Sequence, residues 1–218
     1  MILFAEKSEF SQHILFWWLL APLIALLILP GVMSPVAFQI EPAEVLFLSH
    51  WGGQDREVTM RADAKFDRWF VAPGWVDRSV ALTRPQRMGG PSLAGGVSSF
   101  PAGTGNWLRD WVAGFWMLVY RVLWRVLALG PLYLTAAIGF ALPAFVDGIG
   151  SRLKKRYDFG QHNPIFFYSS MHLVLLAVGL AMFVPITPLT LTPTVLGGFF
   201  LATAAAIWVM AANLQTGA

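Results

Sequence analysis

Long apolar blocks without charge are the feature that most constrains what this chain can fold into. The first, ILFWWLLAPLIALLILPGV at residues 14–32, holds 19 residues and no charged side chain. As an α-helix it is roughly 28 Å long, close to the hydrocarbon core of a bilayer at about 30 Å. The leader MILFAEKSEF carries one lysine and two glutamates, and no small-residue cleavage site follows. The block therefore predicts a retained membrane anchor rather than a cleaved signal peptide.

Three further apolar blocks follow in the second half of the chain. Residues 126–146, 165–186 and 194–212 predict three more spans, and the uncharged turn TPLTLTP joins the last two as an antiparallel hairpin. Only 12% of the residues are charged, whereas soluble domains average about 25%. We expect an all-α integral membrane protein with about four spans. Small residues on the last span are expected to allow close helix contact: Gly197, Gly198, Ala202, Ala204 and Ala205.

Residues 107–125 predict an amphipathic helix rather than a simple span. Asp110, Gly114, Met117, Arg121 and Arg125 share one side of it, so we expect it to lie at the membrane interface or against a partner. Gly130-Pro131 should then break or kink the helix. If the segment crossed the bilayer instead, both arginines would need burial in protein, at several kcal/mol each. The spans would then number five, and the N-terminus would change sides.

Three domains follow from these patterns: an anchor at 1–34, a polar segment at 35–106 and a membrane domain at 107–218. The polar segment holds seven basic and seven acidic residues. Pro42 marks a helix start, and residues 83–106 predict a flexible linker rich in Gly, Pro and Ser. Residues 55–70 predict a surface helix that packs on the bilayer or on another surface. Its apolar side carries Val58, Ala62, Phe66, Trp69 and Phe70.

The positive charge between the second and third spans predicts the orientation. Four basic residues fall within five positions: Arg152, Lys154, Lys155 and Arg156. Short basic loops stay in the cytoplasm, so both termini are expected to be cytoplasmic and residues 35–106 periplasmic, in a bacterial inner membrane. The same cluster could also bind anionic lipid headgroups or a partner, at about 1 kcal/mol per charge. Topology alone explains the charge equally well.

Residues that carry chemistry are sparse. The chain has no cysteine, and His13, His50 and His162 lack the spacing of a metal site. His172 and Ser169 share a face of the third span, yet no carboxylate is placed to orient them. We therefore expect no enzyme activity, no catalytic residue and no cofactor, and interpret His172 as packing or hydrogen bonding between helices. The net charge of +3 gives no reason to expect direct contact with nucleic acid.

The second half of the chain resembles the DUF4400 family of membrane proteins, which conjugative plasmids and integrating conjugative elements encode. The features that carry the resemblance run in order: an arginine-containing helix, an apolar run ending in FVDG, the basic RLKKR, then YDFG and NPIFFY. A Pro-rich turn, VPITPLTLTP, and the terminal AANLQ complete the pattern. Together these features cover roughly residues 107–215.

The resemblance implies a non-enzymatic scaffold of a conjugative type IV secretion apparatus in the inner membrane. Its expected partners are the VirD4-type coupling ATPase or other secretion subunits in the membrane. Anionic lipids and a second copy of the chain are further candidate partners. Candidate contact residues are Arg121, Arg125, Arg152, Lys154, Lys155, Arg156 and His172. The alternative is a small oligomeric transporter or channel. That function needs polar groups at mid-bilayer, where His172 and a few Ser and Thr are the candidates.

Overall fold

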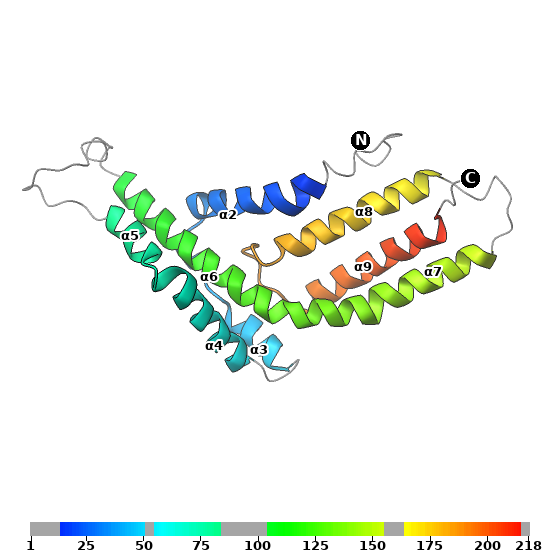
Figure 1. The fold of residues 1–218 in the computed structure, drawn as a ribbon, viewed down its shortest axis with the longest axis horizontal. Coiled ribbons are helices and arrows are strands. Elements are labelled where there is room, and N and C mark those ends of the chain that lie inside the picture. Colours follow the sequence, from blue (N-terminus) through cyan, green and yellow to red (C-terminus); the bar gives the residue numbers. More distant parts are fainter. Residues whose placement is uncertain (1–13, 51–54, 84–103, 155–163, 215–218) are drawn as a thin grey trace, which may run out of the picture. The chain divides into compact units, whose positions relative to one another are not determined.

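A computed structural model describes residues 14–50, 55–83, 104–154 and 164–214 of the chain. These residues form helices and turns and no strand (Figure 1), which confirms the all-α prediction. The α-helices are α2 (Ala21–Val32), α3 (Pro42–His50), α4 (Asp55–Phe66), α5 (Trp75–Leu82), α6 (Thr104–Ala136), α7 (Leu142–Lys154), α8 (Pro164–Phe183) and α9 (Pro193–Ala212). Shorter helical turns at Leu15–Leu20, Pro35–Phe38, Asp67–Val71 and Ala137–Ala141 adjoin them.

Three of the described helical stretches are long and apolar enough to cross a membrane. They are Leu15–Val32, Asn106–Lys154 and Pro193–Ala212, and Phe167–Phe183 is a shorter apolar helix. All four predicted spans fall on these stretches, as expected of a membrane protein. Asn106–Lys154 has 49 residues. At 1.5 Å per residue it is roughly 70 Å long, so only part of it fits in a bilayer core of about 30 Å.

Of the break or kink expected at Gly130-Pro131, the break does not occur, because α6 continues through both residues to Ala136. Pro131 has no N–H and leaves one backbone carbonyl of the preceding turn without its helical donor. Membrane helices tolerate this where side chains and neighbouring helices hold the segment. Here Thr135 Oγ1 donates to Pro131 O at 2.9 Å, and Tyr133 OH donates to Ala181 O of the neighbouring α8 at 3.1 Å.

The helix does not end where the predicted span 126–146 ends. A π-helical turn at Ala137–Ala141 leads directly into α7, which extends to Lys154. Arg152 and Lys154 lie in its last turn, where cations interact favourably with the helix dipole. The basic segment, residues 152–156, therefore begins within a helix rather than in a loop.

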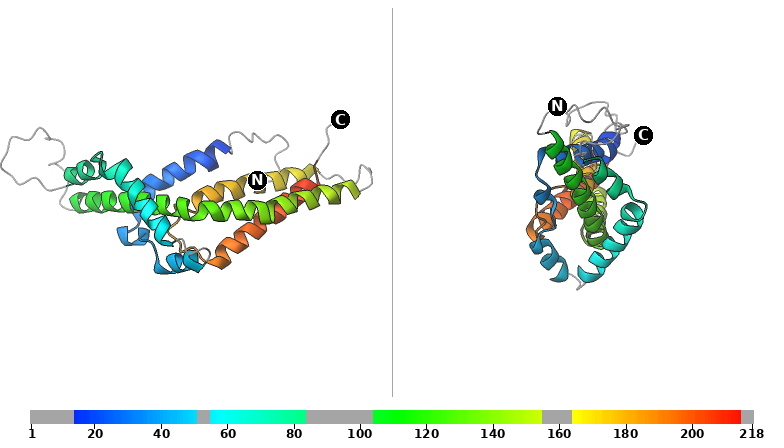
Figure 2. Two further views of the ribbon diagram at one scale, coloured as in Figure 1. Left: turned by 60° about the horizontal axis from the view of Figure 1, so that its bottom comes forward. Right: turned by 90° about the vertical axis from the view of Figure 1, so that its left-hand side faces the viewer.

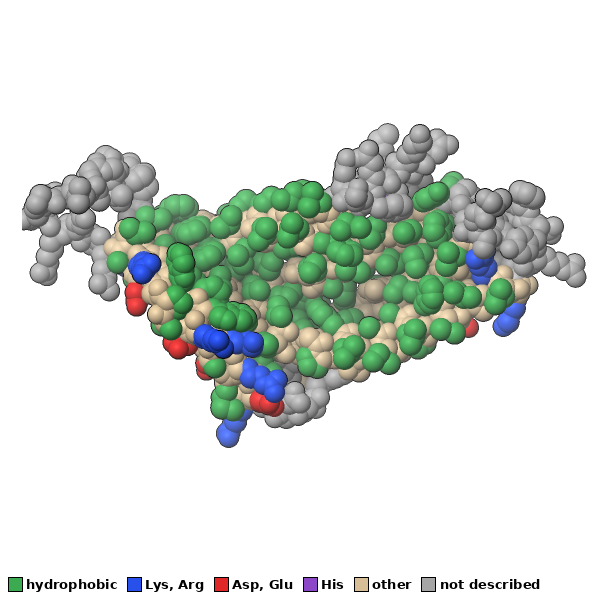
Figure 3. Space-filling view, viewed as in Figure 1, with side chains coloured by type: hydrophobic (Ala, Val, Ile, Leu, Met, Phe, Trp, Pro, Cys, Tyr) green, Lys and Arg blue, Asp and Glu red, His purple; other side chains and the backbone are tan. Residues whose placement is uncertain are grey.

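The chain packs as two compact units. The N-terminal unit comprises residues 23–127, and the hairpin unit comprises residues 1–22 and 128–218. The N-terminal unit therefore includes residues 107–127, which were expected in the membrane domain. In the hairpin unit, α9 packs against both α7 and α8 (Figures 1 and 2). Hydrophobic side chains cover most of the visible surface of these three helices (Figure 3).

Helix α9 approaches α7 closely at Gly148. A Cβ atom at this position would lie 2.7 Å from Ala211 Cβ and 2.8 Å from the Trp208 carbonyl oxygen. Next to it, Trp208 Nε1 donates to Asp147 Oδ2 at 2.8 Å. The small residues predicted to allow close helix contact on the last span are not the ones that meet Gly148. Gly197 and Gly198 would have no atom within 4 Å of an added Cβ, and Ala202 and Ala205 are exposed, because α9 turns Ala211 and Ala212 toward α7 instead.

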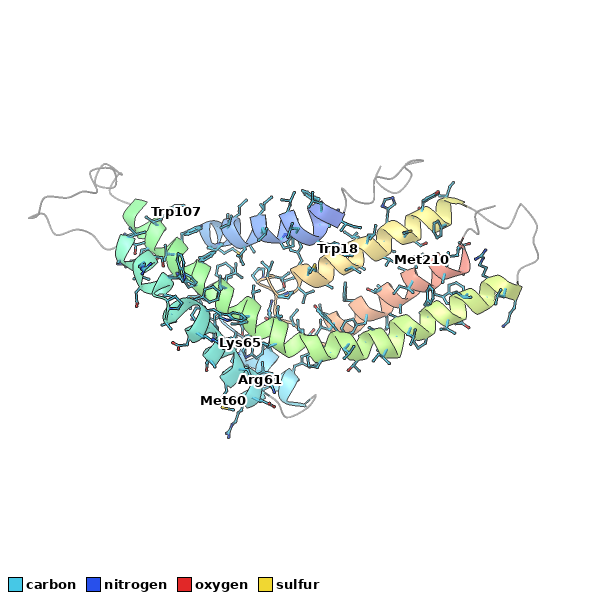
Figure 4. All side chains as sticks on the ribbon, in the orientation of Figure 1. Trp18, Met60, Arg61, Lys65, Trp107 and Met210 are labelled. Carbon is cyan, nitrogen blue, oxygen red and sulfur yellow. The ribbon has the colours of Figure 1, made fainter. Side chains whose placement is uncertain are left out.

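The helical turn Leu15–Leu20, which precedes α2, contacts α8 through Trp17 and Trp18. Trp18 Nε1 donates to Leu175 O at 3.1 Å, and its side chain is labelled in Figure 4. One turn along α8, a Cβ at Gly179 would lie 3.0 Å from Trp17 Cβ. A glycine thus permits close approach here as well.

Helix α6 organises the N-terminal unit through aromatic donors spaced four residues apart. Trp107 and Trp111 lie one turn apart and donate to carbonyls one turn apart on α2. Trp107 Nε1 donates to Gly31 O at 3.2 Å, and Trp111 Nε1 donates to Leu27 O at 3.1 Å. Helix α2 is therefore antiparallel to the start of α6.

A second set of donors, the aromatic row Trp116, Tyr120 and Trp124, connects α6 to α4 and α5. Trp116 Nε1 donates to Ser79 Oγ at 2.7 Å, Tyr120 OH donates to Asp63 Oδ1 at 2.7 Å, and Trp124 Nε1 donates to Thr59 Oγ1 at 3.1 Å. Because the numbers fall along α4 as they rise along α6, these two helices are also antiparallel.

The surface helix predicted at residues 55–70 therefore packs on α6 of its own chain. Val58 and Ala62 are buried in that contact, whereas Trp69 is 49% exposed, contrary to its expected place on the apolar side. Met60 and Arg61 point away from α6 (Figure 4), and charged side chains gather over α4 (Figure 3).

We expect Gly148→Leu to lower the free energy of unfolding of the detergent-solubilised protein by about 1–3 kcal/mol, as overpacking does. The matched control is Gly150→Leu in the same helix, where an added Cβ has no atom within 4 Å. Thermal unfolding followed by circular dichroism measures both variants. Equal loss in the two would contradict the close α7–α9 contact.

Candidate functional site

The N-terminal unit buries an ion cluster formed by Glu44 of α3 and by Arg121 and Arg125 of α6. Arg125 Nε donates to Glu44 Oε2 at 3.1 Å, and its Nη2 pairs with Glu44 Oε1. Arg121 Nη2 donates to the same Oε1 atom at 3.2 Å. All three side chains are buried, with at most 2% exposed. One carboxylate therefore bridges two guanidinium groups that lie one turn apart on α6.

Arg121 also fixes the chain between α2 and α3. Its Nη1 donates to Ala37 O at 2.7 Å, in the 3₁₀ turn Pro35–Phe38. Carbonyls at the end of such a turn lack a helical partner, so a cation there satisfies one of them. The Nε atom of Arg121 is buried without a hydrogen bond among the described residues. The cluster thus attaches two separate segments, the turn and α3, to one face of α6.

Repulsion between the two arginines is offset by Glu44, by the dipole of α3 acting on Glu44, and by Glu41. Two arginines at i, i+4 repel each other, and Glu44 offsets this repulsion. Glu44 lies in the first turn of α3, where a carboxylate interacts favourably with the helix dipole. The exposed Glu41 adds a further favourable Coulomb interaction with Arg121. The two carboxylates balance the two arginines in formal charge.

The structure separates the residues that the sequence proposed as one contact set. Arg121 and Arg125 are buried against Glu44, which corrects the expectation that they face a lipid or a partner. Arg152 and Lys154 lie at the end of α7 in the hairpin unit. His172 lies on α8 of the same unit and is 6% exposed. The remaining two, Lys155 and Arg156, lie outside the described residues.

Sequence reasoning missed Glu44. The signal was present as two arginines at i, i+4 on an otherwise apolar helix, since such a pair needs a carboxylate when it is buried. Glu44 precedes the apolar run VLFL, which makes it the acidic residue of the polar segment most enclosed by apolar neighbours. The sequence does not say that α3 folds back onto α6, because the two are separated by about 80 positions along the chain.

The polar atoms of the cluster are mostly occupied by contacts within the N-terminal unit. Metal sites need several His, Cys, Asp or Glu side chains together, and no three such residues gather in the described part of the chain. Glu44 is engaged on both carboxylate oxygens, so it is poorly placed to act as a base or nucleophile. The hydroxyl of the buried Ser170 donates to Phe167 O of its own helix at 2.9 Å.

One family model matches the chain, over residues 38–215, and it is described as "IncC plasmid conjugative DNA transfer protein DtrJ-like". The matched region includes the whole ion cluster and the helices from α3 to α9. No curated protein and no solved structure matches the chain. The match confirms the resemblance to proteins of conjugation but does not support the name DUF4400 for the family.

We expect Glu44→Gln to lower the free energy of unfolding by about 3–5 kcal/mol, because it leaves two buried guanidinium groups without a counter-charge. The matched control is Glu57→Gln, which removes one carboxylate from the exposed pair Glu57–Arg61 and is expected to cost about 0.3–0.5 kcal/mol. Thermal unfolding in detergent measures both variants. A loss for Glu44→Gln no larger than for Glu57→Gln would refute the importance of the cluster.

Proposed function

Because the chain belongs to the DtrJ-like family of conjugative DNA transfer proteins, we propose that it is a non-enzymatic membrane scaffold of the transfer apparatus. The observation that carries this proposal is the family match over residues 38–215. It extends over more than three quarters of the chain and across both compact units. A role in conjugation follows from the family. The packing of the helices supports the scaffold role.

Polar side chains in the N-terminal unit support the scaffold role because they are used to hold helices together. The ion cluster and the aromatic row occupy strong donors and acceptors in contacts within the unit. In the hairpin unit, large apolar side chains of α6 and α7 are exposed instead. They include Leu134, Ile138, Leu142 and Val146, each at least 56% exposed. Such faces suit lipid chains or the membrane helices of another subunit.

We place the protein in the inner membrane and propose the coupling ATPase, or another membrane subunit of type IV secretion, as its partner. In the proposed orientation the last turn of α7 lies in the cytoplasm, where Arg152 and Lys154 begin the basic segment. Cations at a membrane surface attract anionic lipid and acidic protein surfaces alike. The basic segment is therefore the part of the chain best suited to a contact on the cytoplasmic side.

Deletion of the gene from a donor strain should lower the frequency of plasmid transfer, and the wild-type gene should restore it. Glu57→Gln should restore transfer fully, whereas Glu44→Gln should restore it poorly because the unit unfolds. Mating assays measure transfer, and immunoblots of the membrane fraction measure the amount of each variant. Unchanged transfer in the deletion strain would refute a role in conjugation.

The proposed partner can be tested by affinity purification of the tagged full-length chain from solubilised donor membranes. We expect the coupling ATPase or a secretion subunit to be enriched over a tagged, unrelated membrane protein of similar size. The variant Arg152→Gln, Lys154→Gln should recover less of that partner if the basic segment forms the contact. Recovery of the chain without any subunit of the apparatus would contradict the scaffold role, even if transfer requires the gene.

The orientation can be tested with reporters fused after Gly160. Alkaline phosphatase, which folds only outside the cytoplasm, should be inactive there, whereas green fluorescent protein should be fluorescent. The same two reporters placed in the polar segment, after Gly53, should give the opposite result. Phosphatase activity at Gly160 would reverse the orientation and remove the proposed cytoplasmic contact.

A further inference from the structure

The N-terminal unit contains a cavity of about 380 Å³ between α6, the α4–α5 region and the segment that follows the turn Pro35–Phe38. Its lining residues are Phe38, Gln39, Ile40, Phe66, Val76, Trp116, Met117 and Tyr120. We call this cavity the apolar pocket. Its volume lies in the range of small-molecule sites, roughly 300–1,000 Å³. The single amide in the lining belongs to Gln39, which is exposed.

The polar atoms of the aromatic lining are already hydrogen-bonded within the unit. Trp116 Nε1 donates to Ser79 Oγ, and Tyr120 OH donates to Asp63 Oδ1, each at 2.7 Å. A polar ligand would lose its hydrogen bonds to water on entering and would find few replacements, which costs free energy. An apolar ligand faces no such cost. The pocket therefore selects for hydrocarbon.

The walls of the pocket are held by contacts that do not need a ligand. Phe66 packs edge-on against Trp116 and Tyr120, with ring centroids 6.1 and 5.4 Å apart. Opposite them, Arg121 donates to the carbonyl of Ala37 and so fixes the backbone directly before Phe38. A site that is already ordered loses less conformational entropy when it binds.

One lining residue of the pocket, Phe38, lies close to the helix that the sequence identifies as the first membrane span. A Cβ at Gly114 would lie 3.4 Å from both the Phe38 ring and Pro30 Cβ of α2. The Phe38 ring therefore borders the pocket and also lies at the contact of α2 with α6. Leu27 and Ile28 of α2 are more than half exposed and suit a lipid environment.

We propose that the apolar pocket binds one acyl chain of a membrane phospholipid. The chain would pack between the Phe66–Trp116 side and Phe38, and its polar ester end would lie toward the exposed Gln39. An aromatic or aliphatic side chain of a partner protein is the competing occupant. The lipid is favoured because the lining residue Phe38 lies close to α2, a candidate membrane span, and acyl chains are the most abundant apolar groups around such a span. The proposal is independent of conjugation.

The test uses the full-length chain in nanodiscs of phosphatidylethanolamine and phosphatidylglycerol, with a minor fraction of phosphatidylcholine that carries a diazirine on its acyl chain. After irradiation, mass spectrometry locates the lipid adducts. We expect adducts at Trp116, Met117 or Tyr120 and on α2. We expect severalfold fewer at Met60 and Arg61, which point away from α6. Labelling of the pocket residues no higher than that of Met60 and Arg61 would overturn the proposal, and so would a partner protein as the sole occupant.

Variants that fill the pocket sharpen the test. Met117→Trp and Val76→Trp add bulk from opposite walls, and Met60→Trp adds the same bulk on the exposed face of α4. Both filling variants should lower the adducts at Trp116 and Tyr120 severalfold and leave those on α2 unchanged, whereas Met60→Trp should change neither. Unchanged pocket labelling in a filling variant that keeps its helical circular dichroism would overturn the proposal. If one variant unfolds, the other variant and the distribution of lipid adducts in the wild-type protein still test the proposal.

Discussion

The N-terminal unit depends on the sharing of one buried carboxylate by two arginines of a single helix. Isolated guanidinium groups are costly to bury, so Arg121 and Arg125 can lie in the interior only where Glu44 meets them. This requirement fixes α3 on one face of α6, and the bond from Arg121 to Ala37 fixes the preceding turn as well. A different register of these segments would leave a charge without its partner. The cluster therefore constrains the register in which α3 and the preceding turn pack on α6.

Helix α6 uses the same pattern of side-chain hydrogen bonds on two of its faces. Donors four residues apart on the helix meet acceptors spaced along antiparallel neighbours: carbonyls of α2 in one case and side chains of α4 and α5 in the other. Indole and phenol groups suit this use because each combines a large apolar surface with one hydrogen-bond donor. Many of the tryptophans in the chain are thereby explained as packing residues. They need no cofactor or ligand to account for them.

In the described part of the chain, polar side chains mainly hold helices in position. Its buried charges neutralise each other, and its buried hydroxyl and indole groups mostly bond to their own unit. What remains available is surface: the exposed apolar faces of α6 and α7, the basic end of α7 and the apolar pocket beside α2. For a protein of a conjugative DNA transfer family, these surfaces are where lipids and other subunits would meet it.

The sequence by itself determined the helical class, the apolar stretches and the places where several helices begin, because charge-free length and Pro42 act locally along the chain. It also marked Arg121 and Arg125 as residues that need either a polar surface or burial in protein. Only the tertiary structure decided between these, since Glu44 lies about 80 positions away and its approach depends on how α3 folds back. The same holds for Gly148, whose importance arises from Ala211 of α9. The helix also continues through Pro131 rather than breaking there, where Tyr133 bonds to the neighbouring α8 and Thr135 to its own helix.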